Sequence, residues 1–448
     1  MQSRIVPPRL VIVGINYDPE VSGIAPYTTA VAEHLAKKRW EVLVITGIPH
    51  YPTWRVSGGY RTRVTTAEKS NGVGIRRLRH YVPSTQHVHK RALYEISFGA
   101  HVLTQRLPWR PDVVLAIVPS LLGAAAACRL AQRHSVPLSL WLQDLMGKAA
   151  AQSGMAGGSF AANIVTEVER RLLRQAKSIA VISDAFQAHV EAMGIEPHRI
   201  IQIPNWTQIS PPNGDRARMR CERGWTDDLT VVMHSGNMGL KQDLDNVVEA
   251  ARLAELQASK VRFVLMGEGS QRNRLVELGK GMSTLEIIPP IASDRYADTL
   301  AAADLLLVNE RPGVLDMSLP SKLTSYMLAG RPIVAAVDKA GSTARQIRVS
   351  GSGILVEPAN PQALLQAVTA LALDTRTAAA LAAHGPAYAA KRLSPGVAMT
   401  RVEALLRLAL QGWGRRQWRP LSGSASYNHA TQRVDDRGET VGDHSGSV

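Results

Sequence analysis

The sequence predicts an α/β protein of two domains, each built on a parallel sheet that is covered by helices. The chain has 448 residues, which is more than a domain with one hydrophobic core usually contains, so we expect two domains. Strand-like apolar runs alternate with helical patterns almost throughout, and repeated strand–helix units imply parallel sheets. This rhythm breaks over residues 204–228, where Pro, Asn, Gly and Arg accumulate, so we interpret that stretch as an inter-domain linker.

The first half of the chain, residues 1–203, has the pattern of one Rossmann-like domain. Pro26 suits the first turn of a helix over 26–38, because the N–H that proline lacks would have no partner there. The other expected helices cover 120–132, 167–175 and 186–193. The expected strands cover 9–15, 41–46, 112–118, 138–142 and 178–182.

The second half, residues 229–412, repeats this pattern and predicts a second Rossmann-like domain, whose last helices are free to pack back on the first. The expected strands cover 229–234, 261–266, 285–288, 304–308 and 333–337. The expected helices cover 244–257, 296–303 and 362–373, together with one that begins near 320 and ends at 330. Residues 413–448 form a polar tail whose part from 421 onward lacks periodicity, which predicts disorder.

Composition narrows the class of protein further. Cys128 and Cys221 have no metal-binding spacing and build no disulfide framework, which favours a reducing compartment such as the cytoplasm. The net charge of +15 favours a polyanion or an anionic membrane surface as partner, although a GC-rich genome that prefers Arg would also produce it.

No segment of the chain has the pattern of a secretory signal or of a membrane-spanning helix. The apolar run at 10–15 is too short for a signal peptide. The longer run at 113–131 is interrupted by Pro119, so it fits a buried strand, a turn and a buried helix better than a membrane span.

Three short motifs in the second half are typical of phosphate binding. In LPSKLTSYM, Ser321 and Lys322 stand at a helix start, where free N–H groups and the helix dipole favour an anion. In HSGNMGLKQ, a strand ends in the small-residue turn around Gly236 and Asn237, and Lys241 follows. An ordinary helix start and a tight turn beside a surface lysine are the alternatives.

The third of these motifs, MGEGSQRNRL, is again a strand followed by a glycine-rich turn, at Gly267 and Glu268. It lacks the third glycine of the dinucleotide fingerprint G-x-G-x-x-G. Ligands of doubly wound sheets bind at the carboxyl ends of the strands, where all three motifs fall, so we expect the two domains to face a central cleft.

The first half offers fewer candidates. In NYDPEVSGIAPYT, Gly23 would let a backbone face the cleft, whereas we interpret Asp18 and Glu20 as solvated loop acids. In WLQDLMG, Asp144 closes a strand and could contact a substrate hydroxyl or simply cap the next turn. We interpret His50, His87 and His89 as surface or acceptor-side residues.

Taken together, the motifs resemble those of retaining glycosyltransferases of the GT-B fold in family four, over about residues 9–410. The likeness is to exopolysaccharide transferases of the colanic-acid type, usually described as fucosyltransferases. It rests on GINYDPEVSGIAPYT, WLQDL, VISDAF, IPNW, HSGNMGLKQDLDNVVEAA, VLMGEGSQR and SLPSKLTSYMLAGRPIVA in this order. The resemblance implies that a sugar moves from a nucleoside-diphosphate donor to an acceptor with retention of anomeric configuration.

The resemblance also assigns roles to residues. The donor diphosphate would lie between Gly23, Lys241 and the amides of Ser321 and Lys322, which would stabilise the leaving group. Gly236, Asn237, Gly267 and Glu268 would complete the donor site. No metal or other cofactor is expected, since lysines and helix dipoles would do the metal's work.

Two departures from the family pattern concern the catalytic residues. The family often has two glutamates separated by seven residues, but here the second falls at Ser325 and the first near Met317. Asp316 is the nearest acid, and we expect it to contact the donor sugar, while Ser325 bonds a ribose hydroxyl. The frequent His-Asp pair is Gln143-Asp144 here, and Asp144 would orient donor or acceptor hydroxyls.

The basic segment 76–110 holds seven Lys or Arg and one acid, Glu95, with Tyr81, Tyr94, Phe98 and Trp109 interspersed. It suits an anionic membrane surface that holds a polyprenyl-diphosphate-linked saccharide acceptor, although a solvated basic loop is an equal alternative. The expected location is then the cytoplasm, peripheral to the inner face of the membrane, and no nucleic-acid partner is expected.

Three other functions agree less well with the sequence. An NDP-sugar 2-epimerase would share the fold but lacks a convincing acid/base trio, and a non-catalytic membrane- or nucleic-acid-binding protein would not need three phosphate-facing turns. A dehydrogenase is disfavoured because neither half contains the dinucleotide fingerprint. The base (guanine or uracil), the sugar (GDP-fucose is one possible donor) and the acceptor stay open.

Overall fold

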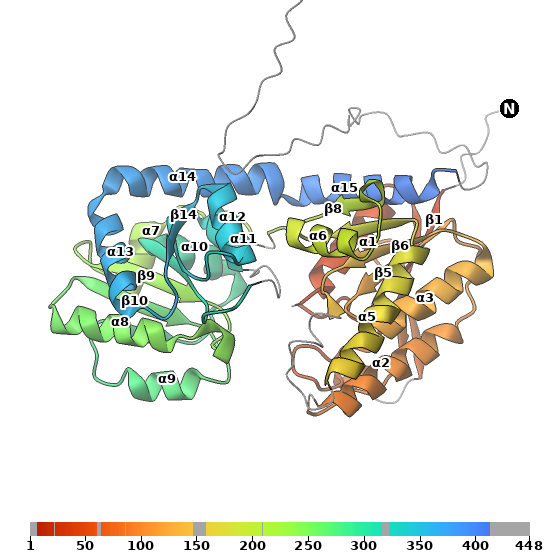
Figure 1. Cartoon of the computed structure of the whole chain (residues 1–448), viewed down its shortest axis with the longest axis horizontal. Coiled ribbons are helices and arrows are strands. Elements are labelled where there is room, and N and C mark those ends of the chain that lie inside the picture. Colours follow the sequence, from red (N-terminus) through yellow and green to blue (C-terminus); the bar gives the residue numbers. More distant parts are fainter. Residues whose placement is uncertain are drawn as a thin grey trace, which may run out of the picture. The chain divides into compact units, whose positions relative to one another are not determined.

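A computed structural model describes residues 7–21, 23–60, 64–85, 87–146, 158–207, 209–315 and 322–412. Within these ranges the chain forms two α/β lobes, an N-terminal lobe with an eight-stranded sheet and a C-terminal lobe with a six-stranded sheet (Figure 1). The predicted fold class of two parallel-sheet domains is therefore confirmed. The tail over 413–448 lies outside the described residues.

The N-terminal sheet has the strand order β3-β4-β2-β1-β5-β6-β7-β8. All neighbours in it are parallel except the antiparallel pair β3 and β4. The strands are β1 (Arg9–Val13), β2 (Glu41–Gly47), β3 (Thr65–Ser70), β4 (Val73–Leu78), β5 (Val113–Val118), β6 (Leu138–Leu142), β7 (Ser178–Val181) and β8 (Ile200–Gln202).

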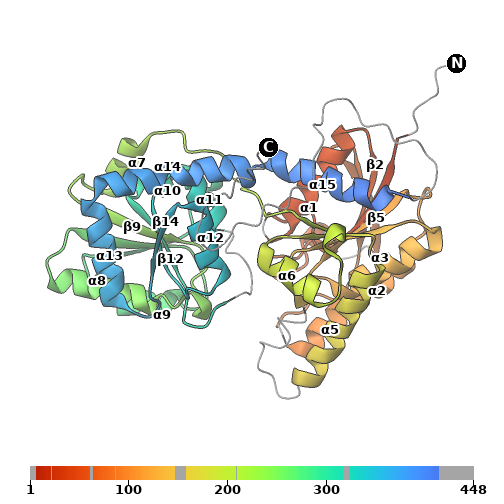
Figure 2. The ribbon, with the colours of Figure 1, turned by 45° about the horizontal axis from the view of Figure 1, so that its top comes forward.

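Helices cover both faces of this sheet, because residues along each strand point alternately to two separate cores. In β1, for example, Val11 and Val13 point to one core, and Leu10 and Ile12 to the other. The first core is covered by α2 (Val88–Leu103), α3 (Leu121–His134), α5 (Gly158–Gln175) and α6 (Asp184–Ala192). The second is covered by α1 (Ala25–Lys37) and by α15 (Pro395–Leu410) (Figure 2).

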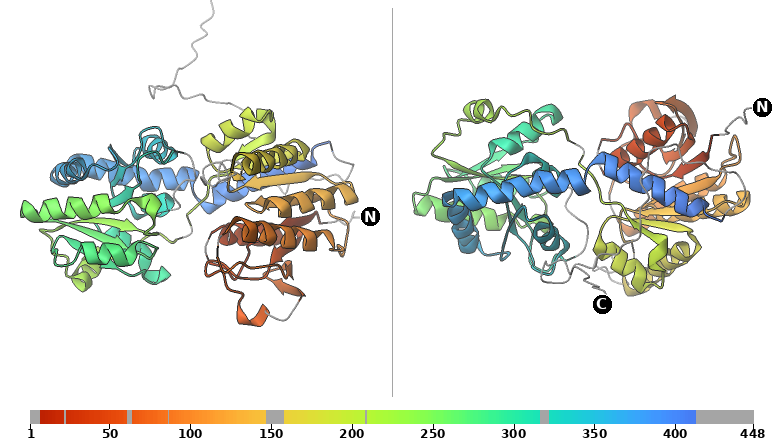
Figure 3. Two further views of the ribbon diagram at one scale, coloured as in Figure 1. Left: turned by 60° about the horizontal axis from the view of Figure 1, so that its bottom comes forward. Right: turned by 90° about the horizontal axis from the view of Figure 1, so that it is seen from above.

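Helix α15 comes from the far end of the chain and packs on the N-terminal sheet, along which it runs in both views of Figure 3. Its buried Val402 and Leu406 share the second core with Trp206. Polar contacts fix its position as well: Ser178 Oγ donates to the carbonyl oxygen of Leu405 (3.0 Å), and His34 Nε2 lies 2.9 Å from Glu403.

The C-terminal sheet is parallel throughout, in the order β11-β10-β9-β12-β13-β14. Its strands are β9 (Thr230–Ser235), β10 (Val261–Met266), β11 (Leu285–Ile288), β12 (Leu305–Asn309), β13 (Ile333–Ala336) and β14 (Gly353–Val356). One face packs against α8 (Asp245–Leu256), α9 (Arg272–Leu278) and α13 (Pro361–Leu373). The other face packs against α7 (Arg216–Arg223), α10 (Ser293–Ala302), α11 (Lys322–Ala329), α12 (Ser342–Ser350) and α14 (Thr375–Arg392).

The segment 204–228, interpreted as a linker, contains helix α7. Met219 of this helix and Trp225 just beyond it are buried in the core of the C-terminal lobe. Three short 3-10 turns complete the described structure: η1 (Gly58–Tyr60), η2 (Pro197–Arg199) and η3 (Leu240–Gln242). Among the described residues, no helix is both long enough and apolar enough to cross a membrane.

Candidate functional site

Two turns meet at the carboxyl edge of the C-terminal sheet, after β9 and β10. These strands are parallel neighbours, with Ser235 beside Met266 at their ends. Gly236 N donates to the Met266 carbonyl oxygen at 2.9 Å, and a Cβ on Gly267 would lie only 1.9 Å from the Gly236 carbonyl oxygen. Gly267 also has a φ of +152°, so both sterics and backbone conformation require glycine here.

The side chain of Lys322, the first residue of α11, lies against this pair of turns. A Cβ on Gly236 would be in ordinary van der Waals contact with Lys322 Nζ, at 3.5 Å, so the ammonium group lies directly against this turn. The same Nζ donates to Nε2 of His234, at 3.2 Å. His234 is completely buried at the end of β9, and burial holds its pKa well below the usual value, so the imidazole is neutral and can accept this bond.

Burial also makes Lys322 unusual, because it lowers the pKa of the ammonium group to about 7. Glu310 opposes this effect and Lys241 adds to it through their charges. Glu310 follows β12 and is buried at 4% exposure, and burial raises its pKa. Its carboxylate accepts a hydrogen bond from Thr343 Oγ1 at 3.3 Å. The site therefore contains two lysines, of which Lys322 is only partly charged near pH 7, and one weakly solvated acid.

Lys241 is placed by its neighbours in the 3-10 turn η3. Asn309, buried at the end of β12, donates through Nδ2 to the carbonyl oxygens of Gln242 (2.8 Å) and Asp243 (2.9 Å). Arg311 N donates to the Lys241 carbonyl oxygen at 3.0 Å. Neither Asn309 nor Glu310 was predicted as a site residue. Both stand where a strand ends, and this position is the sequence feature from which they could have been predicted.

The remaining donor-site candidates of this lobe have separate surroundings. Asn237 is exposed and lies 3.4 Å from Gln242 Oε1, within its own turn. Glu268 is exposed and lies 3.4 Å from Arg272 Nε. Ser325 is half-buried on α11. Asp316 and Ser321 lie outside the described residues.

Helix α11 is locked to the sheet beneath these turns by a tyrosine. Tyr326 is completely buried, and its hydroxyl accepts a hydrogen bond from Ser235 N at 2.6 Å. Ser235 Oγ in turn lies 3.0 Å from the hydroxyl of Tyr296 on α10. This network fixes α11, and with it Lys322, against the ends of β9 and β10.

In the N-terminal lobe the structure corrects the interpretation of Glu20 and His50. Glu20 is not a solvated loop acid: it is buried and accepts hydrogen bonds from the backbone N–H groups of His50 and Tyr51, both at 2.8 Å, and from Asn16 Nδ2, also at 2.8 Å. His50 is buried too, and its Nε2 lies 3.1 Å from the hydroxyl of Tyr94. Sequence reasoning missed this network because its members come from distant segments.

The other candidates of this lobe lie at the carboxyl ends of strands or in loops. Gly23 has a φ of +66°, and a Cβ there would lie 3.1 Å from the ring of Tyr51. Asp144 accepts a hydrogen bond from Leu145 N at 3.0 Å, and burial raises its pKa. Gln143 is buried, and its side-chain nitrogen has no hydrogen-bond partner within the described part of the chain.

The basic segment 76–110 is only partly a surface. Arg77 is buried and pairs with Glu68 at 2.9 Å, and two of the interspersed aromatic residues, Tyr94 and Phe98, belong to the core rather than to an exposed patch. His87 and His89 are exposed, as expected, and their rings stack at 5.9 Å. In the described ranges, no group of three or more His, Cys, Asp or Glu side chains is arranged to hold a metal ion.

Comparison with known proteins identifies the class. A glycosyl transferase 4-like domain matches residues 22–206, and a domain of glycosyl transferases group 1 matches residues 230–374. With two parallel-sheet lobes and two glycine turns at a sheet edge, these matches define an enzyme, a glycosyltransferase. The chain belongs to the GT-B glycosyltransferases of family four, which sets aside the non-catalytic alternative.

Individual relatives agree with this assignment. The chain is 29% identical over 374 residues to a protein of Escherichia coli K12 described as a colanic acid biosynthesis glycosyl transferase, WcaI, covering 80% of this chain and 91% of the relative. Sucrose-phosphate synthase of Thermosynechococcus elongatus superposes with a TM-score of 0.67 at 17% identity, over 89% of this chain and 98% of that one. Anabaena HepE, solved in complex with UDP, has a TM-score of 0.66 at 17% identity, over 89% and 99% of the two chains.

The close approach of the two turns makes a prediction about stability. Gly267→Ala should lower the melting temperature more than Gly281→Ala. Both glycines have a positive φ, but only at Gly267 would the added Cβ overlap another atom, the Gly236 carbonyl oxygen. Backbone strain costs about 1–2 kcal/mol at each position, and overpacking adds about 1–3 kcal/mol at Gly267. Thermal unfolding of both variants measures the difference, and equal losses would contradict the packing described here.

Proposed function

We propose that this glycosyltransferase moves a sugar from a nucleoside-diphosphate donor to a lipid-linked saccharide acceptor, with retention of configuration, in exopolysaccharide synthesis. The observation that carries the donor half of this proposal is Lys322 Nζ lying against the side-chain-free turn at Gly236, 3.2 Å from a neutral His234. A buried ammonium group beside a glycine turn suits a diphosphate. The UDP complex of Anabaena HepE and the colanic-acid relative support the same reading.

In the proposed reaction, the acceptor hydroxyl oxygen bonds to the anomeric carbon on the face that the diphosphate leaves. The bond to the diphosphate oxygen breaks, and that departing oxygen takes up the hydroxyl proton. Negative charge then grows on the departing nucleoside diphosphate, and the ammonium groups of Lys241 and Lys322 stabilise it. Ser321 would contribute through its amide, while Asp144 and Asp316 would hold sugar hydroxyls. The two lysines take the place of a metal ion, so none is required.

The nature of the donor is proposed at two levels. The coarser proposal, a nucleoside diphosphate sugar, rests on the lysines and glycine turns of the C-terminal lobe. The finer proposal, GDP-fucose, rests only on the likeness to colanic-acid-type enzymes, and UDP-sugars are the competing candidates. A panel of GDP- and UDP-sugars therefore tests both levels at once.

Replacement of one proposed phosphate-binding lysine should show whether the donor binds at this site or is attracted by the overall basic charge of the protein. Lys241→Ala should weaken donor binding and slow donor hydrolysis by at least about tenfold, equivalent to about 1.4 kcal/mol. The matched control is Lys260→Ala, an exposed lysine of the same lobe that pairs with Asp228 at 3.0 Å. Calorimetry and hydrolysis assays over the donor panel, with and without EDTA, measure these effects.

Equal losses in the two lysine variants would contradict the donor site as described. Loss of hydrolysis on EDTA treatment of the wild type would contradict the metal-free proposal alone. If no nucleotide sugar binds to the wild type, the whole donor assignment fails.

The lowered pKa of Lys322, about 7, makes donor binding depend on pH. An anionic diphosphate favours the charged lysine, which is already present below pH 7 and must take up a proton above it. Donor affinity should therefore be nearly constant just below pH 7 and fall by up to about tenfold per pH unit above it. Donor sugars are the right probe, because their diphosphate diester does not titrate in this range.

The groups that act on Lys322 are His234, its hydrogen-bond partner, and the charges of Glu310 and Lys241. Calorimetry from pH 7 to 9 with wild type and Lys322→Met measures the slope. The variant should bind weakly with a flat profile, and a variant as steep as the wild type would refute the role of Lys322.

For the acceptor half, we propose that the enzyme lies on the inner face of an anionic membrane through helix α2. Leu93, Ile96 and Leu103 of this helix are 47%, 53% and 37% exposed. With the exposed Ala100 they follow the spacing of one helix face. Basic groups lie nearby, since Arg133 Nη1 donates to the Leu103 carbonyl oxygen at 2.7 Å. An apolar stripe beside cations is the pattern of interfacial helices.

A charge on this stripe should weaken membrane binding. Ile96→Asp should reduce co-sedimentation with phosphatidylglycerol vesicles severalfold, because a carboxylate would have to enter the interface. Leu256→Asp on α8, at a leucine that is 79% exposed, is the matched control and should bind like the wild type. Equal binding by all three proteins would argue against α2 as the membrane-facing helix.

A further inference from the structure

His234 occupies an otherwise apolar position of the C-terminal sheet. In the parallel register it lies beside Leu265 on β10, and the register with β12, continued by one residue, brings it next to Leu307. Both leucines are completely buried, as is His234 itself. An apolar side chain would fit here without the cost of burying a polar ring, so the presence of an imidazole requires a reason other than packing.

The hydrogen bond to Lys322 supplies that reason. An ammonium group has three donors and no acceptor, so Nε2 of the neutral ring accepts this bond at 3.2 Å, and Nδ1 carries the ring proton. The backbone groups of Asn237 and Leu307 also favour a proton on the ring. The acceptor nitrogen of His234 is thus the one that faces Lys322.

This hydrogen bond is stronger for the charged form of Lys322 than for the neutral amine, because a charged donor roughly doubles the strength of a hydrogen bond. Burial acts in the opposite direction and lowers the pKa of Lys322 to about 7, and the charge of Lys241 lowers it too. The charge of Glu310 raises it. His234 therefore acts in the same direction as Glu310, but it adds no negative charge that would repel a diphosphate.

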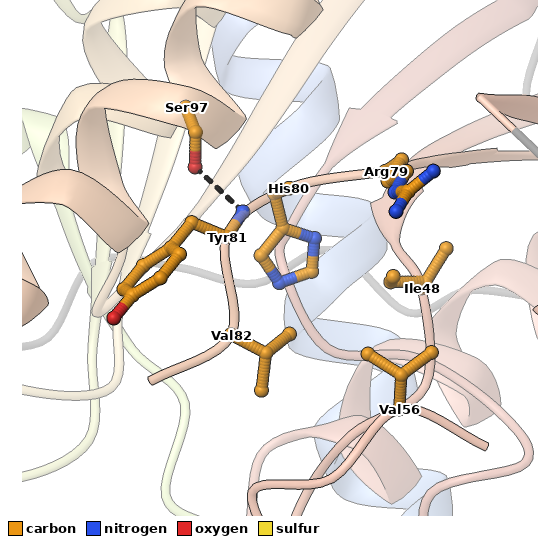
Figure 4. Close-up of a pocket in the computed structure, with 7 residues that line it drawn as sticks. All are labelled: Ile48, Val56, Arg79, His80, Tyr81, Val82 and Ser97. Carbon is orange, nitrogen blue, oxygen red and sulfur yellow. Dashed lines mark hydrogen bonds between the residues drawn. The ribbon is translucent and has the colours of Figure 1, made fainter. Parts of the chain in front are cut away.

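His80, a buried histidine of the N-terminal lobe, shows the contrast. It lies in the wall of a pocket of about 670 Å³ (Figure 4). Its ring packs against those of His50, Tyr94 and Phe98, at centroid distances of 4.9, 5.2 and 5.9 Å, and its Nδ1 lies 3.2 Å from the Leu78 carbonyl oxygen. Aromatic packing and a backbone contact account for this ring, whereas the partner of His234 is a lysine of the candidate donor site.

We propose that His234 is a positioning residue of the donor site, which keeps Lys322 charged and fixed against the turn at Gly236. It does not touch the donor and acts only through the lysine. The inference rests on the proposed function and deepens it, because it names a residue that sets the pH range over which the enzyme binds its donor.

Replacement of His234 by leucine should change the pH dependence of donor binding, not only its strength. His234→Leu resembles the neighbouring leucines and removes the acceptor, which should lower the pKa of Lys322 by about one further pH unit. Less of the lysine is then charged, so affinity for UDP-glucose or GDP-fucose should be about twofold below that of the wild type at pH 6 and about tenfold below it at pH 8. Calorimetry at both pH values measures this ratio, in which the effects of Glu310 and Lys241 cancel because both proteins contain them.

Two further variants separate the acceptor atom from packing. His234→Gln can place its amide oxygen near the position of Nε2, so its affinity should stay within about twofold of the wild type at both pH values. His234→Asn is too short to reach Lys322 and should behave like the leucine variant. The matched control is His80→Phe, which removes a buried imidazole from the other lobe and should leave donor affinity unchanged at both pH values.

A double-mutant cycle tests whether His234 acts through Lys322. In the Lys322→Met background, His234→Leu should change donor affinity by less than about twofold, because the group on which His234 acts is absent. A histidine with a merely structural role would weaken binding equally in both backgrounds.

A ratio of leucine-variant to wild-type affinity that is the same at pH 6 and pH 8 would overturn the proposal, as would equal effects of His234→Leu with and without Lys322. If the leucine variant does not fold, identical pH profiles of the Gln and Asn variants would overturn it. If no donor sugar binds to the wild type, the proposed function itself has failed, whereas donor binding with a pH-independent ratio refutes only the role of His234.

Discussion

The contact between two backbones at Gly236 and Gly267 determines the geometry of the candidate donor site. A side chain at Gly267 would overlap the carbonyl oxygen of Gly236, so the two turns can meet only as glycines. Lys322 of α11 lies against this pair of turns, with its Nζ 3.5 Å from the position that a Cβ on Gly236 would take. His234 and Tyr326 then hold this helix start from below. Each of these positions depends on the one before it, which makes the glycine pair the constraint behind the site.

Electrostatics explains why such a site suits an anion. Lys322 lies close to Lys241 and is removed from water, so its positive charge is poorly compensated by Glu310 alone. A bound diphosphate would supply the missing negative charge beside both lysines. The packing of α11 against β9 thus places the Lys322 charge at the sheet edge before any ligand binds.

Much of this could be predicted from the sequence, and the limits have physical reasons. The central strands of both sheets were predictable because strands of buried parallel sheets are continuous apolar runs, whereas the short edge strands β8 and β14 were not predicted. The edge hairpin β3–β4 was not predicted either, because β3 is mostly exposed and polar, and two arginines interrupt the apolar pattern of the buried β4. Helix α2 was also not predicted, because its basic residues are typical of an exposed surface loop.

The same distinction holds for the sites. Gly236 and Lys322 were found because each belongs to a local motif at a strand or helix end. Glu310 and Glu20 were missed or misread, because the burial of an acid is decided by segments far away in the chain.

The position of α15 has a consequence for how the protein folds during its synthesis. The core that includes Trp206 is closed by Val402 and Leu406, which a ribosome produces almost two hundred residues later. Until then, the nascent first lobe has an uncovered apolar sheet face while the second lobe is being synthesised. Such a face is a target for chaperones and for premature association. The order of translation therefore makes maturation of the first lobe wait for the last helix.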